Sequence, residues 1–358
     1  MLSAIARPFA ALALAATLIS IVLAALGASP IGVFAALGEG AFGSWYGCVD
    51  TLVKSTPLIF TGLAISLAFS GALWNIGADG QLTIGAIAAG AIGPQLGNFP
   101  HPLAIAIILG AGALGGAAWG GLAGWLRARR DVNEVISTIM LNFVAVQALS
   151  WVVHGPLMEP SRAYPTSSPI ASAAQLECYL APSRLNLGML LAVVLAAACY
   201  MLLFNTSAGF ELRAMGRNRR AATFFGVRIP ALTIWVMALS GALAGLGGAV
   251  QVSAISHRLY EKLSPGWGFE AIAVALVARL NPLGIIPAAL LFGAIDNGSQ
   301  AMQRTQGISP ELVQVIQGLV ILIILAFDTP AWSGLRENIF GASGDASAVP
   351  PVAELPDA

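Results

Sequence analysis

Three short polar stretches interrupt an otherwise apolar chain, and their side chains are the ones that could hold a solute. In the first, NIGADGQ (residues 75–81), Asn75, Asp79 and Gln81 surround two glycines. Glycine lets the backbone turn tightly and present N–H groups at the start of a helix. A broken helix beside an ionisable residue is typical of a solute pathway. A hairpin turn at the cytoplasmic surface, capped by Asp79, fits the length equally well.

The second stretch, NEVISTIMLN (residues 133–142), opens a predicted helix. Asn133 can cap that helix, and Glu134 suits the positive end of its dipole. Glu134, Thr138 and Asn142 recur every four residues and so form one polar stripe. In lipid such a stripe must face other helices or a wet cavity. Solute contact and hydrogen bonding between helices both satisfy that requirement.

The third stretch, GWGFEAIAVALVARLNPLG (residues 266–284), places Trp267 and Phe269 beside Glu270. An aromatic ring can stack on a solute ring while the carboxylate holds a hydroxyl group. Trp267 can equally be an anchor at the membrane interface. The candidate residues of a solute pathway are Asn75, Asp79, Gln81, Thr138, Asn142, Phe269 and Glu270.

A fourth stretch, FELRAMGRNRRAA (residues 210–222), is charged in a chain with only 9% charged residues. Its charged side chains are Glu211, Arg213, Arg217, Arg219 and Arg220. Phe210, Ala214, Ala221 and Phe225 recur at helical spacing, which predicts a helix lying along a surface with its arginines in water. A topology signal alone explains the arginines but not the glutamate or the apolar stripe, so a docking helix is the favoured interpretation.

The elements that position these residues are predicted to be membrane helices. The 358 residues are 57% apolar with a mean hydropathy of +0.81, whereas soluble domains are about 25% charged. The predicted fold is therefore all-α, a polytopic membrane protein with about ten transmembrane helices. Their windows are residues 8–28, 55–73, 81–97, 103–126, 134–153, 186–204, 231–254, 268–280, 283–298 and 311–327.

The distribution of positive charge predicts the orientation. The first window is long enough to span a bilayer, so it is interpreted as a retained helix rather than a signal peptide. A cytoplasmic N-terminus places eleven basic residues inside and six outside, as the positive-inside rule requires. The outer six are Lys54, Arg162, Arg184, Arg258, Lys262 and Arg304. Both termini are then cytoplasmic, and the protein lies in a plasma (inner) membrane.

Several functions are excluded by what the sequence lacks. Neither lysine, Lys54 or Lys262, stands in a phosphate-binding loop, so any ATP hydrolysis belongs to another chain. No catalytic constellation is present, and the scattered cysteines and histidines predict no metal site. A net charge of zero gives no reason to expect nucleic-acid binding. A disulfide between Cys48 and Cys178, both in predicted outer loops, is possible but has no support from spacing.

An internal similarity suggests a repeat. Residues 70–81 and 240–251 match at six of twelve positions and lie in windows of opposite orientation. An inverted repeat of five helices would give this pattern, although glycine- and alanine-rich helices also match by chance.

Together the four stretches resemble the permease subunits of bacterial ABC importers for purine nucleosides and simple sugars, over residues 55–330. These permeases are relatives of ribose and branched-chain amino-acid permeases. The resemblance implies a type-II-like ABC importer permease, residues 1–335, with residues 205–228 as a cytoplasmic coupling segment that docks on an ATPase. The positions that it assigns to docking are Phe210, Glu211, Leu212, Arg213, Gly216, Arg217 and Asn218. It places ATP and magnesium on the partner ATPase and no cofactor on this chain.

The resemblance also implies partners: a cytoplasmic ATPase, a second permease in a heterodimer, a periplasmic or lipoprotein substrate-binding protein, and membrane lipid. The chain departs from the family pattern at Asp79, Glu270 and Arg219, where Glu, Asp and Pro are expected. The two carboxylate exchanges keep the charge and move it by about a methylene. A secondary carrier coupled to ions or protons is the alternative function, but it gives the coupling segment no role. Residues 336–358 are predicted to be a disordered cytoplasmic tail.

Overall fold

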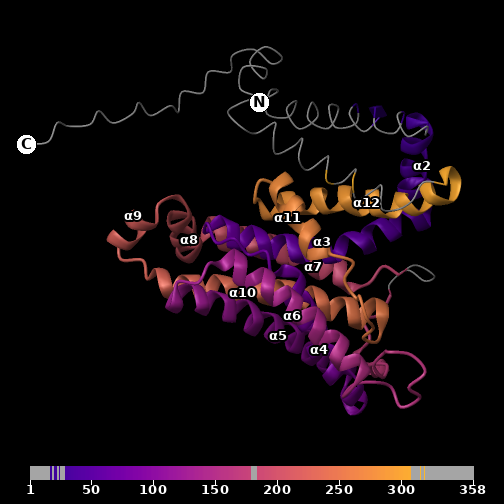
Figure 1. Cartoon of the computed structure of the whole chain (residues 1–358), viewed down its shortest axis with the longest axis horizontal. Helices are drawn as coiled ribbons and strands as arrows, with labels where there is room; N and C mark the ends of the chain where they lie inside the picture. Colours follow the sequence, from indigo (N-terminus) through magenta and orange to yellow (C-terminus); the bar gives the residue numbers. More distant parts are fainter. Residues whose placement is uncertain are drawn as a thin grey trace, which may run out of the picture. The chain divides into compact units, whose positions relative to one another are not determined.

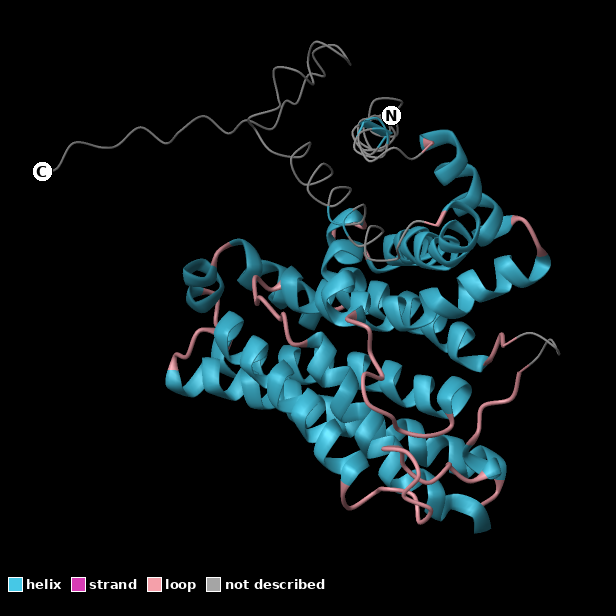
Figure 2. Ribbon diagram, turned by 45° about the vertical axis from the view of Figure 1, so that its right-hand side comes forward, coloured by secondary structure: helices cyan, strands magenta, loops and turns pink. Residues whose placement is uncertain are grey.

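The computed structural model describes residues 29–178 and 184–307, together with residues 17, 20, 21, 24, 315 and 318 (Figure 1). Every regular element in these residues is a helix, and none of them is a strand (Figure 2). Contacts divide the chain into one unit of residues 31–314 and a second unit made of its two ends. The all-α prediction is confirmed.

The helices follow one another with short connections, apart from the longer loops that precede α7 and α11. They are α2 (Pro30–Phe42), α3 (Trp45–Ser70), α4 (Ala78–Ile92), α5 (His101–Arg130), α6 (Glu134–His154), α7 (Leu187–Asn205), α8 (Ser207–Arg217), α9 (Arg219–Phe224), α10 (Ile229–Gln251), α11 (Trp267–Val277) and α12 (Pro282–Gln306). A π-helical turn, Val252–Ser256, extends α10, and 3-10 turns occupy Gly93–Asn98 and Ser172–Ala174.

Each predicted window between residues 55 and 298 coincides with a helix. Within the part of the chain that the structure describes, five helices are long and apolar enough to cross a membrane: α3, α5, α6, α7 and the α10 region. Most of the windows 8–28 and 311–327, and all of the predicted tail, lie outside the described residues. Two boundaries were wrong. Helix α12 has 25 residues rather than a short span, and α3 begins at Trp45, so Lys54 lies inside a helix and not in an outer loop.

The core is a bundle in which α4, α5 and α10 pack on one another, with α6 against α4 (Figure 1). Helices α5 and α10 approach closely because glycines face each other across the contact. A side chain on Gly116 or Gly241 would collide with the backbone of the opposite helix. Small residues allow such approach where no hydrophobic force drives helices together. Helix α3 connects this bundle to α7, α11 and α12.

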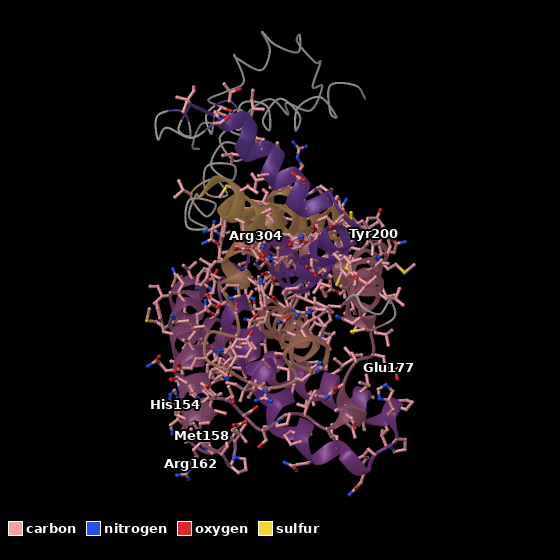
Figure 3. The ribbon with its side chains drawn as sticks, turned by 90° about the vertical axis from the view of Figure 1, so that its right-hand side faces the viewer. His154, Met158, Arg162, Glu177, Tyr200 and Arg304 are labelled. Atoms are coloured by element: carbon pink, nitrogen blue, oxygen red, sulfur yellow. The ribbon has the colours of Figure 1, made fainter. Side chains whose placement is uncertain are left out.

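The two ends of the bundle differ in character. Helices α8 and α9 lie at one end, and the loop of residues 155–178 lies at the other (Figure 1). That loop is fastened to its surroundings by the His101 ring, 2.9 Å from the Ala173 carbonyl, and by an ion pair between Arg258 and Glu159. His154, Met158 and Arg162 lie together at the edge of this end (Figure 3).

The structure bears on two possibilities that the sequence raised for distant segments. Cys48 and Cys178 are free thiols, so the possible disulfide is not formed. Residues 240–251 continue one helix, α10, whereas residues 70–81 end α3, cross an irregular segment and begin α4. The two similar segments therefore do not share a conformation.

Candidate functional site

The coupling segment is seated on the end of α3. Thr206 caps α8 by accepting a hydrogen bond from the Gly209 N–H at 3.1 Å. One turn later, Leu212 and Met215 are buried over Gly71, where any side chain would collide with both. Gly216 lies so close to the Ser70 carbonyl that a β-carbon would not fit. The helix is thus fixed to residues 70–71 by a contact that requires glycine on both sides.

The face by which this segment packs differs from the predicted one. Phe210 and Phe225, expected in the apolar stripe, are exposed, and the buried face is made by Leu212, Met215 and Ala222. The helix is also interrupted at Asn218, because its side chain accepts from the Ala221 N–H at 3.0 Å and starts α9. Both patterns are apolar at helical spacing, so the sequence does not distinguish them.

The predicted docking residues fall into two groups. Phe210, Glu211, Arg217 and Asn218 are exposed. Leu212 and Gly216 face α3, and the Arg213 guanidinium lies 5.0 Å from the centre of the Phe204 ring in a cation–π contact. The outward group can contact a partner, and the inward group holds the segment in place.

Two further aromatic side chains of this surface were not among the predicted docking residues. Phe224 is 87% exposed and Phe225 is 82% exposed, and their rings pack edge to face. Large exposed aromatics beside arginines are characteristic of protein interfaces. The sequence analysis placed Phe225 in an apolar stripe and did not single out Phe224.

A pocket of about 540 Å³ opens between α9, the end of α5 and the start of α10. Its lining combines two arginines with apolar side chains: Arg129, Thr223, Val227, Arg228, Ile229, Pro230, Ala231 and Ile234. Arg129, in the last turn of α5, therefore lies at the same end of the molecule as the coupling segment.

The NIGADGQ stretch is not a surface turn. Asn75 is fully buried, and its Nδ2 donates to Gln81 Oε1 at 3.0 Å and to Ser240 Oγ at 2.8 Å. Gln81 Nε2 and the Gly77 N–H both donate to Asn75 Oδ1, each at 3.0 Å. Ser240 belongs to α10, so these bonds join the break between α3 and α4 to the middle of another helix.

Asn142 joins the same break to α6. Its Oδ1 accepts from the Gly80 N–H at 2.8 Å, and its Nδ2 donates to the Ile76 carbonyl at 2.9 Å. Thr138 is buried against Gly77 and bonds back to the Glu134 carbonyl of its own helix at 2.6 Å. Asn75, Gln81, Asn142 and Ser240 are called the buried polar cluster below.

Asp79 is a helix cap, but not of its own helix. Its Oδ1 accepts from the Ser264 hydroxyl at 2.6 Å and from the Gly268 N–H at 3.0 Å, at the start of α11. The carboxylate therefore stabilises the positive end of α11, while α4 has no side-chain cap. A side chain on Gly268 would collide with Asp79, so the N-termini of α4 and α11 meet at this point.

Phe269 and Glu270 differ from the other five candidates because they are not enclosed. Phe269 is 49% exposed and Glu270 is half-buried, whereas Asn75, Asp79, Gln81, Thr138 and Asn142 are all buried. The bonds of those five hold α4, α6, α10 and α11 in place around the break. Phe269 and Glu270, next to Gly268 in α11, have surface left for a solute.

Comparison with known proteins identifies the family. The description "Branched-chain amino acid transport system / permease component" matches residues 47–325. The chain belongs to this permease family. The permease is 32% identical to the guanosine ABC transporter permease protein NupP of Bacillus subtilis, over 90% of this chain and 93% of that protein. It is also 32% identical to the glucose ABC transporter permease protein TsgB13 of Haloferax volcanii, over 85% and 83% of the two chains.

A more distant relative is the ribose import permease protein RbsC of Escherichia coli, 26% identical over 76% of this chain and 81% of that protein. The resemblance inferred from the four stretches is thus confirmed, and the chain is an ABC importer permease. The alternative of a secondary carrier is not supported. The permease is a transport protein and not an enzyme, and it is a multi-pass membrane protein.

Proposed function

We propose that this permease carries a nucleoside or a simple sugar, delivered by a binding protein, and that the coupling segment docks on a cytoplasmic ATPase. The observation that carries the proposal is the seating of α8 on residues 70–71 with its polar face turned outward. The named relatives transport guanosine, glucose or ribose, and all three solutes are uncharged and rich in hydroxyl groups.

The outward face has the composition of a protein interface. Phe210, Phe224 and Phe225 supply large exposed rings, and Glu211 and Arg217 supply charges of both signs. Buried aromatic anchors dominate interface energies, while rim charges set partner choice and association rate. This combination favours a soluble protein partner, because lipid headgroups would not need the acidic residue or the rings.

The packing of α8 on residues 70–71 supports a mechanical link between the coupling segment and the solute pathway. Leu212 and Met215 rest on Gly71, and Asn75 of the buried polar cluster follows four positions later. A shift of α8 driven by ATP binding therefore acts on the irregular segment between α3 and α4. That segment is bonded to α6 and α10, so its displacement reaches the helices around the pathway. Net transport follows because the ATPase and the solute favour different states of the permease.

The proposed solute contacts are Phe269 and Glu270. A ring that is half exposed can stack on a base or on the apolar face of a sugar, and the adjacent carboxylate accepts hydrogen bonds from hydroxyl groups. The proposed role of the five buried candidates is to shape the wall of the pathway; they are Asn75, Asp79, Gln81, Thr138 and Asn142. Their hydrogen bonds fix the helices that carry Phe269 and Glu270.

The remaining features of the complex are proposed from the distribution of positive charge and from membership of the permease family. The arginine-rich end of the bundle faces the cytoplasm, and both termini lie there. A second, different permease completes a heterodimer, surrounded by membrane lipid. Residues 1–335 form the transmembrane domain and residues 336–358 a disordered tail. ATP and magnesium bind to the ATPase.

The docking proposal is tested with Arg217→Glu in the complete importer, reconstituted in proteoliposomes. Reversing an exposed charge at the docking face is expected to lower co-purification of the ATPase and guanosine uptake about tenfold or more, equivalent to about 1.4 kcal/mol of binding. Arg162→Glu is the matched control, since it reverses an exposed arginine at the opposite end of the bundle.

Equal losses in both variants, or no loss in Arg217→Glu, would contradict docking through the coupling segment. The same vesicles test the solute class. Excess ribose, glucose or unlabelled guanosine should reduce uptake if its class is carried, while leucine should not. Competition by leucine alone would contradict the proposed substrate class and leave the docking result standing.

A further inference from the structure

The pocket between α9, the end of α5 and the start of α10 has no part in the proposed function, and it is called the α9 pocket below. Its volume of about 540 Å³ is within the range of about 300–1,000 Å³ that is usual for ligand pockets. Among the described residues that line it, none is acidic and two are arginines, Arg129 and Arg228. The rest of the lining, apart from Thr223, is apolar: Val227, Ile229, Pro230, Ala231 and Ile234. A basic part and an apolar part thus share one pocket.

The two arginines of the α9 pocket have no acidic partner in the described part of the chain. Asp131 and Glu134, the first acidic residues after α5, both pair with Arg127 instead, at 2.8 Å and 3.0 Å. The side chains of Arg129 and Arg228 are exposed. The first turn of α10, which has no side-chain cap, also lines the pocket and adds the positive end of its dipole. The potential in the pocket is therefore positive, and a bound anion would balance it.

The α9 pocket lies at the depth of the lipid headgroups. It is formed by the last turn of α5 and the first turn of α10, and both helices are long and apolar enough to cross a membrane. The 30 residues of α5 extend about 45 Å, whereas the hydrocarbon core is about 30 Å thick, so the ends of α5 reach the headgroup region. Trp125 agrees with this depth, because its ring is 42% exposed and lies 5.9 Å from the Arg130 guanidinium. Such aromatic rings are typical of the membrane interface.

From the α9 pocket, exposed apolar side chains continue along both membrane helices. On α5, Leu122, Trp125 and Arg129 recur at spacings of three and four residues, so they share one face of the helix. On α10, Ala231 and Trp235 are likewise four residues apart. Leu122 is 40% exposed and Trp235 is 43% exposed. A molecule whose charged group lies in the pocket can therefore place hydrocarbon chains along these two faces, toward the centre of the membrane.

We propose that the α9 pocket binds an anionic phospholipid, with Arg129 and Arg228 contacting its phosphate and its acyl chains lying along α5 and α10. Basic pockets between membrane helices recognise acidic headgroups, and arginine forms paired hydrogen bonds with phosphate oxygens. The mostly apolar lining favours a lipid over an acidic protein side chain or a free phosphate ion. A bound headgroup would contact α5, α9 and α10 together, and so hold α9 against the bundle. This inference depends neither on the solute that is carried nor on docking of the coupling segment.

The experiment compares two lipids at this position in the complete importer. Leu122→Cys carries a fluorophore after the other cysteines of the importer have been replaced; it lies seven residues, about 10 Å, from Arg129 and outside the pocket. The importer is placed in nanodiscs of phosphatidylcholine with increasing fractions of spin-labelled phosphatidylglycerol or spin-labelled phosphatidylcholine, each labelled near the top of one acyl chain. Quenching of the fluorophore gives the ratio of the two binding constants. Phosphatidylglycerol should bind more tightly, and Arg129→Gln and Arg228→Gln should each lower the ratio about fivefold.

Two control variants accompany these changes. Arg162→Gln combined with Arg184→Gln removes two exposed arginines outside the α9 pocket, and it should leave the ratio unchanged. Arg129→Lys combined with Arg228→Lys keeps both charges, and it should retain most of the preference for phosphatidylglycerol.

Three results would overturn the proposal. The first is a ratio that stays the same when both pocket arginines are changed to glutamine. The second is reversal of the quenching by inorganic phosphate or glycerol phosphate, which would assign the pocket to a free phosphate. The third is loss of ATPase co-purification in the double glutamine variant with an unchanged lipid ratio, which would assign the pocket to the protein interface. A negative outcome for Arg217→Glu would leave the lipid site standing, because that residue does not line the pocket.

Discussion

The coupling segment and the buried polar cluster are both polar sequences in an apolar chain, yet the structure uses their polarity in opposite ways. In the coupling segment, apolar Leu212 and Met215 are buried and the charged side chains Glu211 and Arg217 are exposed. In the cluster, Asn75 and Gln81 are themselves buried and pair with each other. Polar groups exposed to water remain available to bind a partner, whereas the buried polar groups already form hydrogen bonds within the protein.

The difference predicts which variants will lower the stability of the protein and which will only weaken its binding to the ATPase. A buried polar group that loses its partner keeps its desolvation cost, and a crowded backbone contact has no room to relax. An exposed side chain loses only what it contributes to binding. The largest effects on stability are therefore expected near the cluster, and the smallest in the coupling segment.

Gly268→Ala is expected to have the largest effect. The added methyl group would collide with the backbone of Asp79, and it would separate the Asp79 carboxylate from the N–H that it caps at the start of α11. Overpacking costs about 1–3 kcal/mol, and losing the cap adds about 1 kcal/mol. Folded protein recovered in detergent should fall severalfold, as measured by size-exclusion chromatography.

Gly110→Ala is the matched control for this change. It adds the same methyl group to a membrane helix, α5, at a position with nothing within 4 Å of the new β-carbon. Helix propensity alone would make it neutral or slightly stabilising. If the two variants behaved alike, the meeting of the α4 and α11 termini at Asp79 would be disproved.

Asn75→Leu should come next. The substitution leaves the Gln81 amide and the Gly77 N–H without the partner they now share, while Ser240 Oγ keeps its bond to the Ala64 carbonyl. Each buried unsatisfied group costs about 1–3 kcal/mol, so a total loss of about 3 kcal/mol is expected. The midpoint of thermal unfolding should fall, followed by exposure of the buried Cys199 thiol to a maleimide dye in protein lacking Cys48 and Cys178.

The control for Asn75→Leu is Gln95→Leu, which removes an exposed amide that bonds to the Ala91 carbonyl at 3.2 Å. Its unfolding midpoint should stay within a degree or two of the unaltered protein, since water replaces the lost bond. An unchanged midpoint in Asn75→Leu would indicate that the cluster contributes no net stability.

How far the sequence predicted these two regions follows from the range of the interactions. Long apolar windows predicted α5, α6 and α7 closely, and Asn133 caps α6 as expected, accepting from the Val135 N–H at 2.9 Å. Those features depend on neighbours in sequence. The partner of Asp79, Gly268, lies 189 positions away, and no local pattern could assign it.

The coupling segment shows a different limit. Its location and its helical conformation were predicted, but the wrong apolar face was assigned because two apolar stripes coexist in residues 209–225. Only the glycine at position 71 decides between them, since it makes room for Leu212 and Met215. The start of α3 was also missed, because the polar residues before position 55 ended the apolar window although the helix continues through them. Lys54, inside that helix, was therefore assigned to an outer loop.

The smallest effect on stability is expected for Phe224→Ala combined with Phe225→Ala. This double variant separates a loss of partner binding from a loss of stability most clearly. Both rings are more than four-fifths exposed, so their removal should leave the unfolding midpoint unchanged. An aromatic anchor at an interface contributes about 1–2 kcal/mol or more, so affinity for the ATPase should fall at least tenfold. Binding is measured by titrating labelled ATPase onto the permease in nanodiscs.

Trp151→Ala is the appropriate control for this pair, since Trp151 is a large aromatic with 68% exposure on α6, away from the coupling segment. Its loss should not alter ATPase affinity. If the double variant instead lowered the unfolding midpoint and left the affinity intact, the rings would be part of the fold. The difference between the coupling segment, whose exposed side chains are free to bind a partner, and the buried polar cluster, whose side chains stabilise the fold, would then not hold for these two aromatic residues.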